Sequence, residues 1–331
     1  MAAAPYLSVE GLTKHFKVKS GIGSSLGIVK AVDDVSFDVE RGEVVGIVGE
    51  SGCGKSTLAR LLMGLIPVDR GELRLQGQPL QMQGRSLLTL RRKMQMVFQD
   101  SHASFDPQRT VIDAISFAPR VHGKPRAAAH AAAESLLGLV GLDPALFRGR
   151  YPHELSGGQR QRVNIARALA LQPEILILDE SVSALDKSVE AQILNLLKQI
   201  KTSLSLTYLF ISHDLNVVEY VSDRILVMYL GQLVETGPVE QVYSQPRHPY
   251  TRALLASKPS LDPRRPTAAA ALSGDPPSPL NPPSGCRFRT RCAHAESVCA
   301  ARAPTLGADD GDAHRVACLM YEPGSGHSLA A

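Results

Sequence analysis

The 331-residue sequence contains no long hydrophobic run and does not begin like an exported protein. A membrane-spanning helix needs about 18 consecutive apolar residues, and no window of the sequence approaches that number. The start, MAAAPYLSVEGLTKHF, lacks a basic stretch followed by an apolar core. We therefore expect neither a signal peptide nor a membrane span, and any role at a membrane is peripheral.

Clustered charge and internal repeats are also missing from the sequence. Lys and Arg number 36 and Asp and Glu number 32, which gives a net charge of +4, and the basic residues are scattered along the chain. This pattern does not indicate a nucleic-acid partner, and we expect none. With 44% hydrophobic and 21% charged residues, the composition is that of a soluble globular protein.

Composition divides the chain into three regions. Residues 6–258 are dense in periodic apolar segments, residues 259–285 are rich in Pro and Ala with almost no large apolar side chain, and the remainder holds four of the five cysteines. We therefore expect a folded domain over residues 1–258 with a helical subdomain at about 100–165, an extended linker over 259–285 and a small C-terminal extension over 286–331.

The apolar runs predict an α/β fold. VVGIV (44–48), ILILD (175–179) and YLFIS (208–212) are continuous, which is typical of strands buried on both faces of a parallel core sheet. AVDDVSFDVE (31–40) alternates instead and predicts an antiparallel edge. The segment 188–200 has its apolar residues at helical spacing, so strand and helix alternate as this fold class requires.

The strand VVGIV leads directly into GESGCGKST (49–57), which matches the phosphate-binding pattern G-x-x-x-x-G-K-[ST] completely and precedes a helical pattern. The glycines let backbone N–H groups and the helix N-terminus face phosphates, the Lys55 side chain reaches the β- and γ-phosphates, and the Ser56 hydroxyl coordinates Mg²⁺. We therefore predict an ATP site with Mg²⁺, in which Cys53 is a small filler and not a nucleophile. The residues expected at the nucleotide are Gly49, Glu50, Ser51, Gly52, Cys53, Gly54, Lys55, Ser56 and Thr57.

A second apolar strand, ILILD, ends in the acidic pair Asp179 and Glu180. At this distance after a phosphate-binding loop, the pair matches a Walker B motif. Asp179 is the expected Mg²⁺ partner at the nucleotide, and Glu180 is placed to act as a general base on the attacking water.

The sequence LSGGQRQRVNIARAL (155–169) lies just before that strand and resembles the signature motif of ATP-binding cassette (ABC) proteins. The resemblance implies that Gln99 in MVFQD is the glutamine that contacts Mg²⁺ and the catalytic site, and that residues 183–186 form the D-loop. It also implies that His213 in FISHD is the catalytic switch histidine and that Phe16 in LTKHF stacks on adenine. An aromatic residue at a strand end is as often part of the core, so both interpretations stay open for Phe16.

In the resembled family two cassettes pair head to tail, so the signature motif of one chain serves the nucleotide held by the other. The catalytic groups therefore form a complete site only when the dimer closes, and we expect an isolated chain to be a poor enzyme. The resemblance gives Lys55, Gln99, Glu180 and His213 catalytic roles. It assigns the partner's nucleotide to Ser156, Gly157, Gly158 and Gln159.

Similarity extends beyond the cassette, because PRHPYTRALL (246–255), SPLNPPSGC (278–286) and the trailing cysteines resemble the ATP-binding subunits of oligopeptide and dipeptide importers. This group also serves nickel and other small solutes. The resemblance covers residues 6–323 and implies a peripheral ATPase at the cytoplasmic face of the inner membrane. Its implied partners are two transmembrane permease subunits, a second ABC ATPase chain that is usually a paralogue, and, indirectly, an extracytoplasmic solute-binding protein.

Ser181 departs from the resembled pattern, because the family usually has a proline after the catalytic glutamate. Without the proline ring the turn loses some rigidity, and we expect a working but slower site.

Other classes of ABC protein fit the sequence less well. Only 97 residues, 58–154, separate the phosphate-binding loop from the signature motif, which leaves no room for the coiled-coil or zinc insertion of a DNA-repair ATPase. A translation-type protein would carry two cassettes. A catalytically weak regulatory or docking subunit of the same complex stays the alternative, although the residues that would be degraded in such a subunit are intact.

The cysteines of the extension are spaced C-x5-C-x6-C-x18-C, which fits neither zinc-finger knuckles nor the ferredoxin run. Four thiolates suit either a tetrahedral Zn²⁺ or a cubane cluster, and the resembled group implies a [4Fe–4S] cluster in this tail. A segment so short and so poor in apolar residues commonly needs a metal centre or disulfides to stabilise its fold. We therefore expect a structural iron–sulfur cluster, and Zn²⁺ or metal-free thiols, reduced or disulfide-paired, stay the alternatives. The expected ligands are Cys286, Cys292, Cys299 and Cys318.

Overall fold

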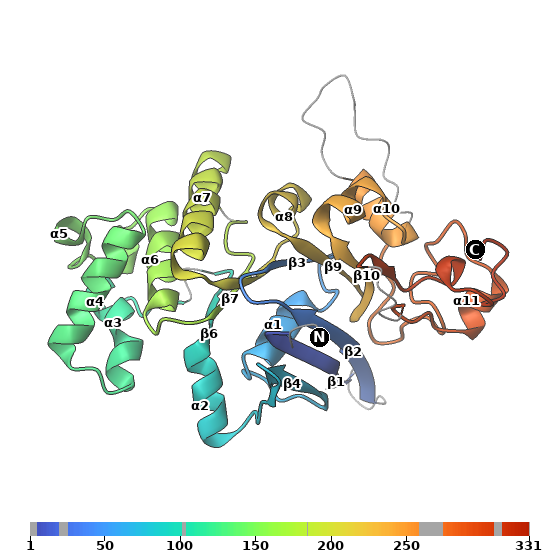
Figure 1. Ribbon diagram of the computed structural model, residues 1–331, viewed down its shortest axis with the longest axis horizontal. Coiled ribbons are helices and arrows are strands. Elements are labelled where there is room, and N and C mark those ends of the chain that lie inside the picture. Colours follow the sequence, from blue (N-terminus) through green and yellow to red (C-terminus); the bar gives the residue numbers. More distant parts are fainter. Residues whose placement is uncertain are drawn as a thin grey trace. The chain divides into compact units, whose positions relative to one another are not determined.

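The computed structural model describes residues 5–19, 26–100, 104–183, 185–257, 274–307 and 313–330 (Figure 1). The chain forms two compact units. The first consists of Met1–Glu40, Val45–Leu80 and His213–Ala331, and the second of Arg41–Val44 and Gln81–Ser212. Most of the predicted linker, together with Ala184 of the predicted D-loop, lies outside the described residues.

An antiparallel sheet with the strand order β2-β1-β4-β5 forms one part of the first unit. The alternating segment at 31–40 lies at the end of β2, which pairs antiparallel with β1, so this prediction is confirmed. The irregular register between β1 and β2 marks bulges in the pair. The strands are β1 (Leu7–Lys19), β2 (Leu26–Val39), β4 (Arg70–Leu75) and β5 (Gln78–Pro79).

A second group of strands in the first unit has the order β11-β10-β9-β3. β3 (Val44–Val48) and β9 (Arg224–Tyr229) pair in parallel, and β10 (Gln232–Pro238) pairs antiparallel with β9 and with the short β11 (Arg315–Val316). The helical elements of this unit are α1 (Lys55–Leu62), α8 (Leu215–Val221), α9 (Val239–Ser244), α10 (Pro249–Ala256), α11 (Ser297–Ala301) and the 3-10 turn η2 (Leu319–Tyr321).

Three parallel strands form the sheet of the second unit, in the order β8-β7-β6. They are β6 (Met94–Val97), β7 (Ile175–Asp179) and β8 (Thr207–Ile211). The helical elements of this unit are α2 (Gly84–Lys93), α3 (Val111–Val121), α4 (Arg126–Leu139), α5 (Pro144–Phe147), the 3-10 turn η1 (Pro152–Glu154), α6 (Gly157–Leu169) and α7 (Lys187–Leu204).

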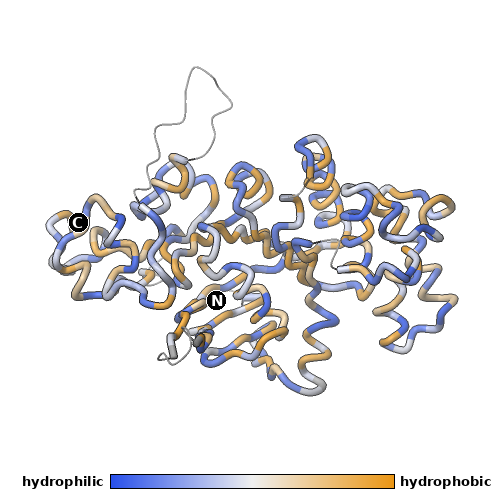
Figure 2. The backbone as a smooth tube through the Cα atoms, turned by 180° about the vertical axis from the view of Figure 1, so that it is seen from behind, coloured by the Kyte–Doolittle hydropathy of each residue, from blue (hydrophilic) through white to orange (hydrophobic). Residues whose placement is uncertain are grey.

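Burial explains why the continuous apolar runs become parallel strands. Every residue of β3, β7 and β8 is buried, and Figure 2 draws the strands mainly in the orange of hydrophobic residues. When both faces of a strand are covered, Val, Ile and Leu at consecutive positions are all shielded from water. The predicted α/β fold with a parallel core and an antiparallel edge is therefore confirmed. Among the described helices, none is long and apolar enough to span a membrane.

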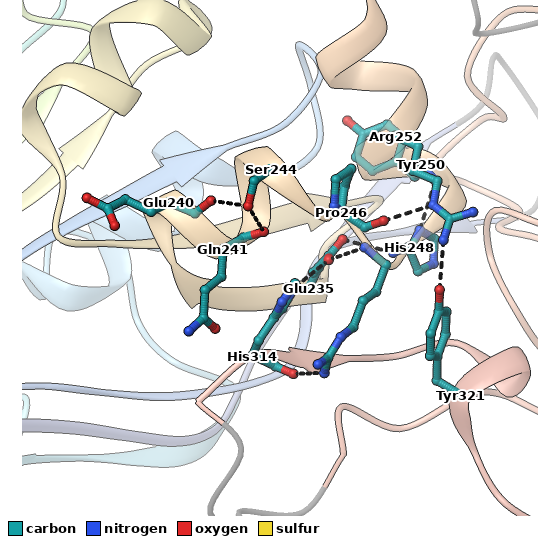
Figure 3. Close-up of polar contacts among 11 residues, drawn as sticks. Glu235, Glu240, Gln241, Ser244, Pro246, His248, Tyr250, Arg252, His314 and Tyr321 are labelled. Carbon is teal, nitrogen blue, oxygen red and sulfur yellow. Dashed lines mark hydrogen bonds and ion pairs between the residues drawn. The ribbon is translucent and has the colours of Figure 1, made fainter. Parts of the chain in front are cut away.

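The C-terminal extension is tied into the first unit through Glu235 on β10 (Figure 3). This carboxylate is fully buried and accepts hydrogen bonds from the backbone N–H groups of Arg247 (2.6 Å) and His248 (3.0 Å). It also contacts the His314 ring, just before β11, at 2.7 Å. Arg252 of α10 also donates to the Tyr321 hydroxyl at 2.7 Å. The extension is thus held to the strand and helix that precede it by buried polar contacts as well as by β11.

His248 caps α10 from a buried position, because its Nδ1 accepts the Tyr250 N–H at 3.0 Å. Burial lowers the pKa of His248 to about 4, against the opposing charge of Glu235. The unfolded chain takes up a proton near the ordinary histidine pKa, whereas the folded chain does so only near pH 4. Below about pH 6.5 the free energy of unfolding therefore falls, by up to about 3 kcal/mol at pH 4.

We predict that His248→Asn, which keeps a capping acceptor but cannot titrate, flattens the decrease in unfolding free energy between pH 6.5 and 4. Urea unfolding at a series of pH values measures the slope. The matched control is His122→Asn at an exposed position after α3, which should leave the slope of the parent unchanged. An equal slope in the His248 variant and the parent would contradict the assignment.

Candidate functional site

The loop between β3 and α1 is shaped by glycines that leave no room for a side chain. Gly49 has φ 150° and Gly54 has φ 111°, both in the region that favours glycine. A Cβ at Gly49 would collide with the Met228 carbonyl oxygen of β9, and a Cβ at Gly54 with the Ala31 carbonyl oxygen of β2. The loop backbone therefore packs directly against two strands, which fixes its path before any ligand binds.

Lys55 is the first residue of α1 and is buried, with 5% of its surface exposed. Its ammonium donates to the carbonyl oxygens of Gly49 (2.8 Å) and Glu50 (3.0 Å), and the described residues give it no ion pair. The helix begins at Gly54 without a side-chain cap. A buried cation beside uncapped helix N–H groups is an arrangement that suits an anion, so these residues fit the predicted phosphate site.

Glu50, at the second position of the loop, is held by two residues that the sequence analysis did not assign to the site. The Tyr250 hydroxyl accepts the Glu50 backbone N–H at 2.8 Å. The Arg291 guanidinium forms two hydrogen bonds to the Glu50 carboxylate, at 2.8 and 3.0 Å, and these hydrogen bonds raise the pKa of Arg291. Tyr250 lies in the HPYTRALL segment and Arg291 lies between two of the cysteines, and neither position carries a local signal for a nucleotide site.

Three other predicted residues of the first unit have defined environments. Cys53 is buried, and burial raises the pKa of its thiol, which agrees with its interpretation as a filler. Phe16 lies within β1 with 37% of its surface exposed, and the Lys14 ammonium is 5.5 Å from its ring centroid. His213 is exposed and directly precedes Asp214, which caps α8.

The second unit brings Gln99 and Glu180 together. The Gln99 side-chain amide donates to the Glu180 carboxylate at 2.6 Å. Glu180 has φ 46°, an unusual value for a residue with a side chain, and its backbone N–H donates to Ile211 at the end of β8. Such backbone strain is commonly kept at functional positions. Asp179, the last residue of β7, is buried with 4% exposure.

The signature segment forms the exposed N-terminus of α6. Ser156 is the helix cap, its hydroxyl accepts the Gln159 N–H at 3.3 Å, and the Gln159 side chain accepts the Ser156 N–H at 3.0 Å. This reciprocal capping box fixes the first turn. Gly158 allows α6 to approach α7, because a Cβ there would lie 2.5 Å from a methyl group of Val189. Gly157 faces Leu185 at an ordinary contact distance.

The four cysteines of the extension converge on one cavity of about 20 Å³, which His248, His294 and His327 also line. Burial and the neighbouring thiols raise the pKa values of Cys286 and Cys318 to about 11, and burial raises that of Cys292. However, in the part of the chain that the structure describes, no group of three or more His, Cys, Asp or Glu residues is placed to hold a metal ion. The structure therefore gives no support to the predicted iron–sulfur or Zn²⁺ centre, because convergence on a cavity is not ligand geometry.

Comparison with known families and proteins agrees with the motifs. Residues 32–183 match the family model described as ABC transporter, and residues 234–299 match the oligopeptide/dipeptide transporter, C-terminal region. A putative peptide import ATP-binding protein of Brucella ovis is 47% identical over 92% of this chain and 95% of its own length. The oligopeptide transport ATP-binding protein AppF of Bacillus subtilis is 45% identical, over 95% of this chain and 97% of its own.

Solved structures give the same fold. The CbiO1 subunit of the CbiONQ ABC transporter complex from Clostridium perfringens is 27% identical and covers 73% of this chain and 91% of its own, with a TM-score of 0.63. The ATP-binding cassette MJ0796, solved as a dimer with ADP and phosphate in a post-hydrolysis state, is 28% identical and has a TM-score of 0.62. It covers 70% of this chain and 98% of its own length.

Ser181 follows the strained Glu180 and is buried, and within the described residues its hydroxyl has no hydrogen-bond partner. We predict that Ser181→Ala raises the free energy of unfolding by about 1 kcal/mol, because the variant no longer buries an unpaired hydroxyl. The control is Ser183→Ala, in which an exposed hydroxyl that donates to the Glu180 carbonyl at 2.9 Å is removed. Chemical unfolding measures both, and a Ser181 variant less stable than the parent would contradict the prediction.

Proposed function

Because the chain belongs to the ATP-binding subunits of the ABC transporter family, we propose that it hydrolyses ATP to power an importer for peptides or related small solutes. The observation that carries this proposal is the combination, in one chain, of the ABC transporter match with the oligopeptide/dipeptide C-terminal match. Relatives that align over more than nine-tenths of the chain are named as peptide import, oligopeptide transport and dipeptide transport ATP-binding proteins.

The residues of the first unit act on the phosphates. The Lys55 ammonium leaves the carbonyl oxygens of Gly49 and Glu50 and turns to the β- and γ-phosphates, and the uncapped N–H groups of α1 supply further donors. Ser56, Gln99 and Asp179 are the proposed holders of Mg²⁺, which when bound neutralises the charge that develops on the phosphates.

Glu180 is the proposed general base. Its carboxylate already accepts the Gln99 amide, and this contact holds the side chain in one orientation. A base must lie within hydrogen-bond reach of the water that it activates, so a fixed carboxylate orientation favours hydrolysis. His213 is the proposed partner that positions the terminal phosphate, and Phe16 offers an exposed ring for the adenine.

Two chains complete the site in this proposal. Ser156, Gly157, Gly158 and Gln159 lie at an exposed helix N-terminus, where they can contact the nucleotide of a second cassette. The second cassette is a paralogue or a copy of this chain. We further propose that the pair binds two transmembrane permease subunits at the cytoplasmic face of the inner membrane, and that an extracytoplasmic solute-binding protein delivers the solute.

We predict that Glu180→Gln keeps ATP binding and slows phosphate release by about 10²–10⁴-fold, because a positioned base contributes that order of rate. The assay uses the chain assembled with its permease and partner cassette. Glu72→Gln, at a half-buried residue of β4 that pairs with Arg74, is the matched control and should hydrolyse ATP at the parental rate. Parental turnover in the Glu180 variant would show that another group activates the water.

For the extension, we propose that the four cysteines hold a [4Fe–4S] cluster, with Zn²⁺ as the alternative. Four thiols that line one cavity supply the donor chemistry of either centre. The raised pKa values of Cys286 and Cys318 keep the metal-free thiols protonated at neutral pH, so binding of a metal centre by these thiols would release their protons.

Iron, sulfide and zinc analysis of anaerobically purified protein tests this assignment. We predict about four irons and four sulfides per chain, and a loss of most of that metal in Cys292→Ser. Cys53→Ser, which changes the one cysteine outside the cavity, should keep the parental metal content. A colourless, metal-free parent protein that folds and assembles would refute the metal site.

A further inference from the structure

Two arginines of the segment 286–292, CRFRTRC, reach elements that shape the phosphate-binding loop. Arg291 binds the Glu50 carboxylate with both terminal nitrogens, at 2.8 and 3.0 Å. Arg287, four residues earlier, is hydrogen-bonded to the Asp33 carboxylate of β2 and to the Leu230 carbonyl oxygen after β9. The backbone of β2 packs closely against Gly54 of the loop, and the backbone of β9 packs closely against Gly49.

The segment that presents these arginines is anchored by a buried aromatic side chain and by backbone hydrogen bonds. Phe288, which lies between them in the sequence, is buried with 3% exposure and packs against Tyr229 and Tyr250 with ring centroids 5.3 and 5.5 Å apart. Its backbone turns through the hydrogen bonds from Arg289 N–H to the Cys286 carbonyl and from Arg291 N–H to the Phe288 carbonyl, at 3.2 and 3.0 Å. The backbone that carries Arg291 is therefore anchored by the buried Phe288, and the Arg291 side chain itself is only 5% exposed.

Glu50 is the residue of the loop that most needs such a partner. It carries a negative charge within a loop that has to receive a highly charged triphosphate, and like charges in a site repel. Only 5% of the Arg291 side chain and 21% of the Glu50 side chain are exposed, so water screens this pair little. Two side chains from outside the loop hold Glu50: Arg291 binds its carboxylate, and the Tyr250 hydroxyl accepts its N–H.

We propose that Arg291 is a positioning residue for ATP binding: the C-terminal extension neutralises Glu50, holds it in the phosphate-binding loop, and so completes the nucleotide site of its own chain. The inference rests on the proposed function, since it takes the loop to be the ATP site. It gives the extension a role at the nucleotide besides the role of its cysteines.

A purely structural role predicts something different. If Arg291 only stabilised the extension, its loss would lower the melting temperature without a specific effect on nucleotide affinity. If Arg291 acts through Glu50, removal of the guanidinium leaves a half-buried carboxylate of the phosphate-binding loop without its ion-pair partner. Replacing that carboxylate by an amide in the same chain then restores affinity.

The test measures the dissociation constant for Mg²⁺-ATP by equilibrium titration of the full-length chain, together with the melting temperature of each variant. We expect Arg291→Ala to raise the dissociation constant by about tenfold, as the loss of charge-assisted hydrogen bonds predicts. We expect Arg291→Lys, which keeps the charge but loses the two-point contact, to lie between the parent and Arg291→Ala. The double variant Arg291→Ala/Glu50→Gln should recover most of the affinity.

The matched control is Arg302→Ala, since Arg302 pairs with Glu322 within the extension and makes no described contact with the loop. It should bind ATP as the parent does. Parental affinity in Arg291→Ala, or a double variant as weak as Arg291→Ala, overturns the inference. If Arg291→Ala does not fold, the affinities of Arg291→Lys and of the double variant test the inference: parental affinity in Arg291→Lys would overturn it. The titration of the parent chain tests the proposed function separately, because a parent chain that does not bind ATP refutes that function itself.

Discussion

The close approach of two strand backbones to the phosphate-binding loop is the constraint on which the rest of the site depends. The carbonyl oxygens of Met228 and Ala31 occupy the space that side chains at Gly49 and Gly54 would need. The loop packs against the strands through its own backbone, and the start of α1 at its end has no side-chain cap. The buried Lys55 ammonium donates to the carbonyl oxygens of Gly49 and Glu50 and to the Cys53 sulfur, an arrangement that suits an added anion.

The C-terminal extension belongs to the same unit as this loop and shares its contacts. β11 adds a strand to β10, the buried Glu235 binds both the start of α10 and His314, and Arg291 reaches Glu50. A polar group as deeply buried as Glu235 is stable only when its hydrogen bonds are satisfied, so these contacts fix the extension in one place. The extension is therefore part of the same compact unit as this loop.

The sequence predicted the elements whose signals are local. The strands at 44–48, 175–179 and 208–212 are continuous apolar runs, and the helix start at Lys55 follows from a complete motif. Contacts between residues far apart in the chain could not be predicted in the same way. Arg291 and Glu50 are separated by 241 positions, and no local pattern of either segment indicates that they pair.

The cysteines illustrate the limit of spacing as evidence. Their pattern correctly suggested that four thiols gather, since all four line one cavity. It could not give the distances and directions that metal ligands need, and these are not met among the described residues. Gln99 and Glu180, by contrast, were assigned from separate motifs and do meet, because both follow neighbouring parallel strands of one sheet.

The measurement that tests the account most directly is ATP turnover per chain as a function of protein concentration, with Mg²⁺, alone and with added partner cassette and permease. If the signature residues of one chain serve the nucleotide of another, turnover per chain rises steeply with concentration or with the partner, and Lys55→Ala abolishes it. Turnover that is independent of concentration in a verified monomer would contradict the account.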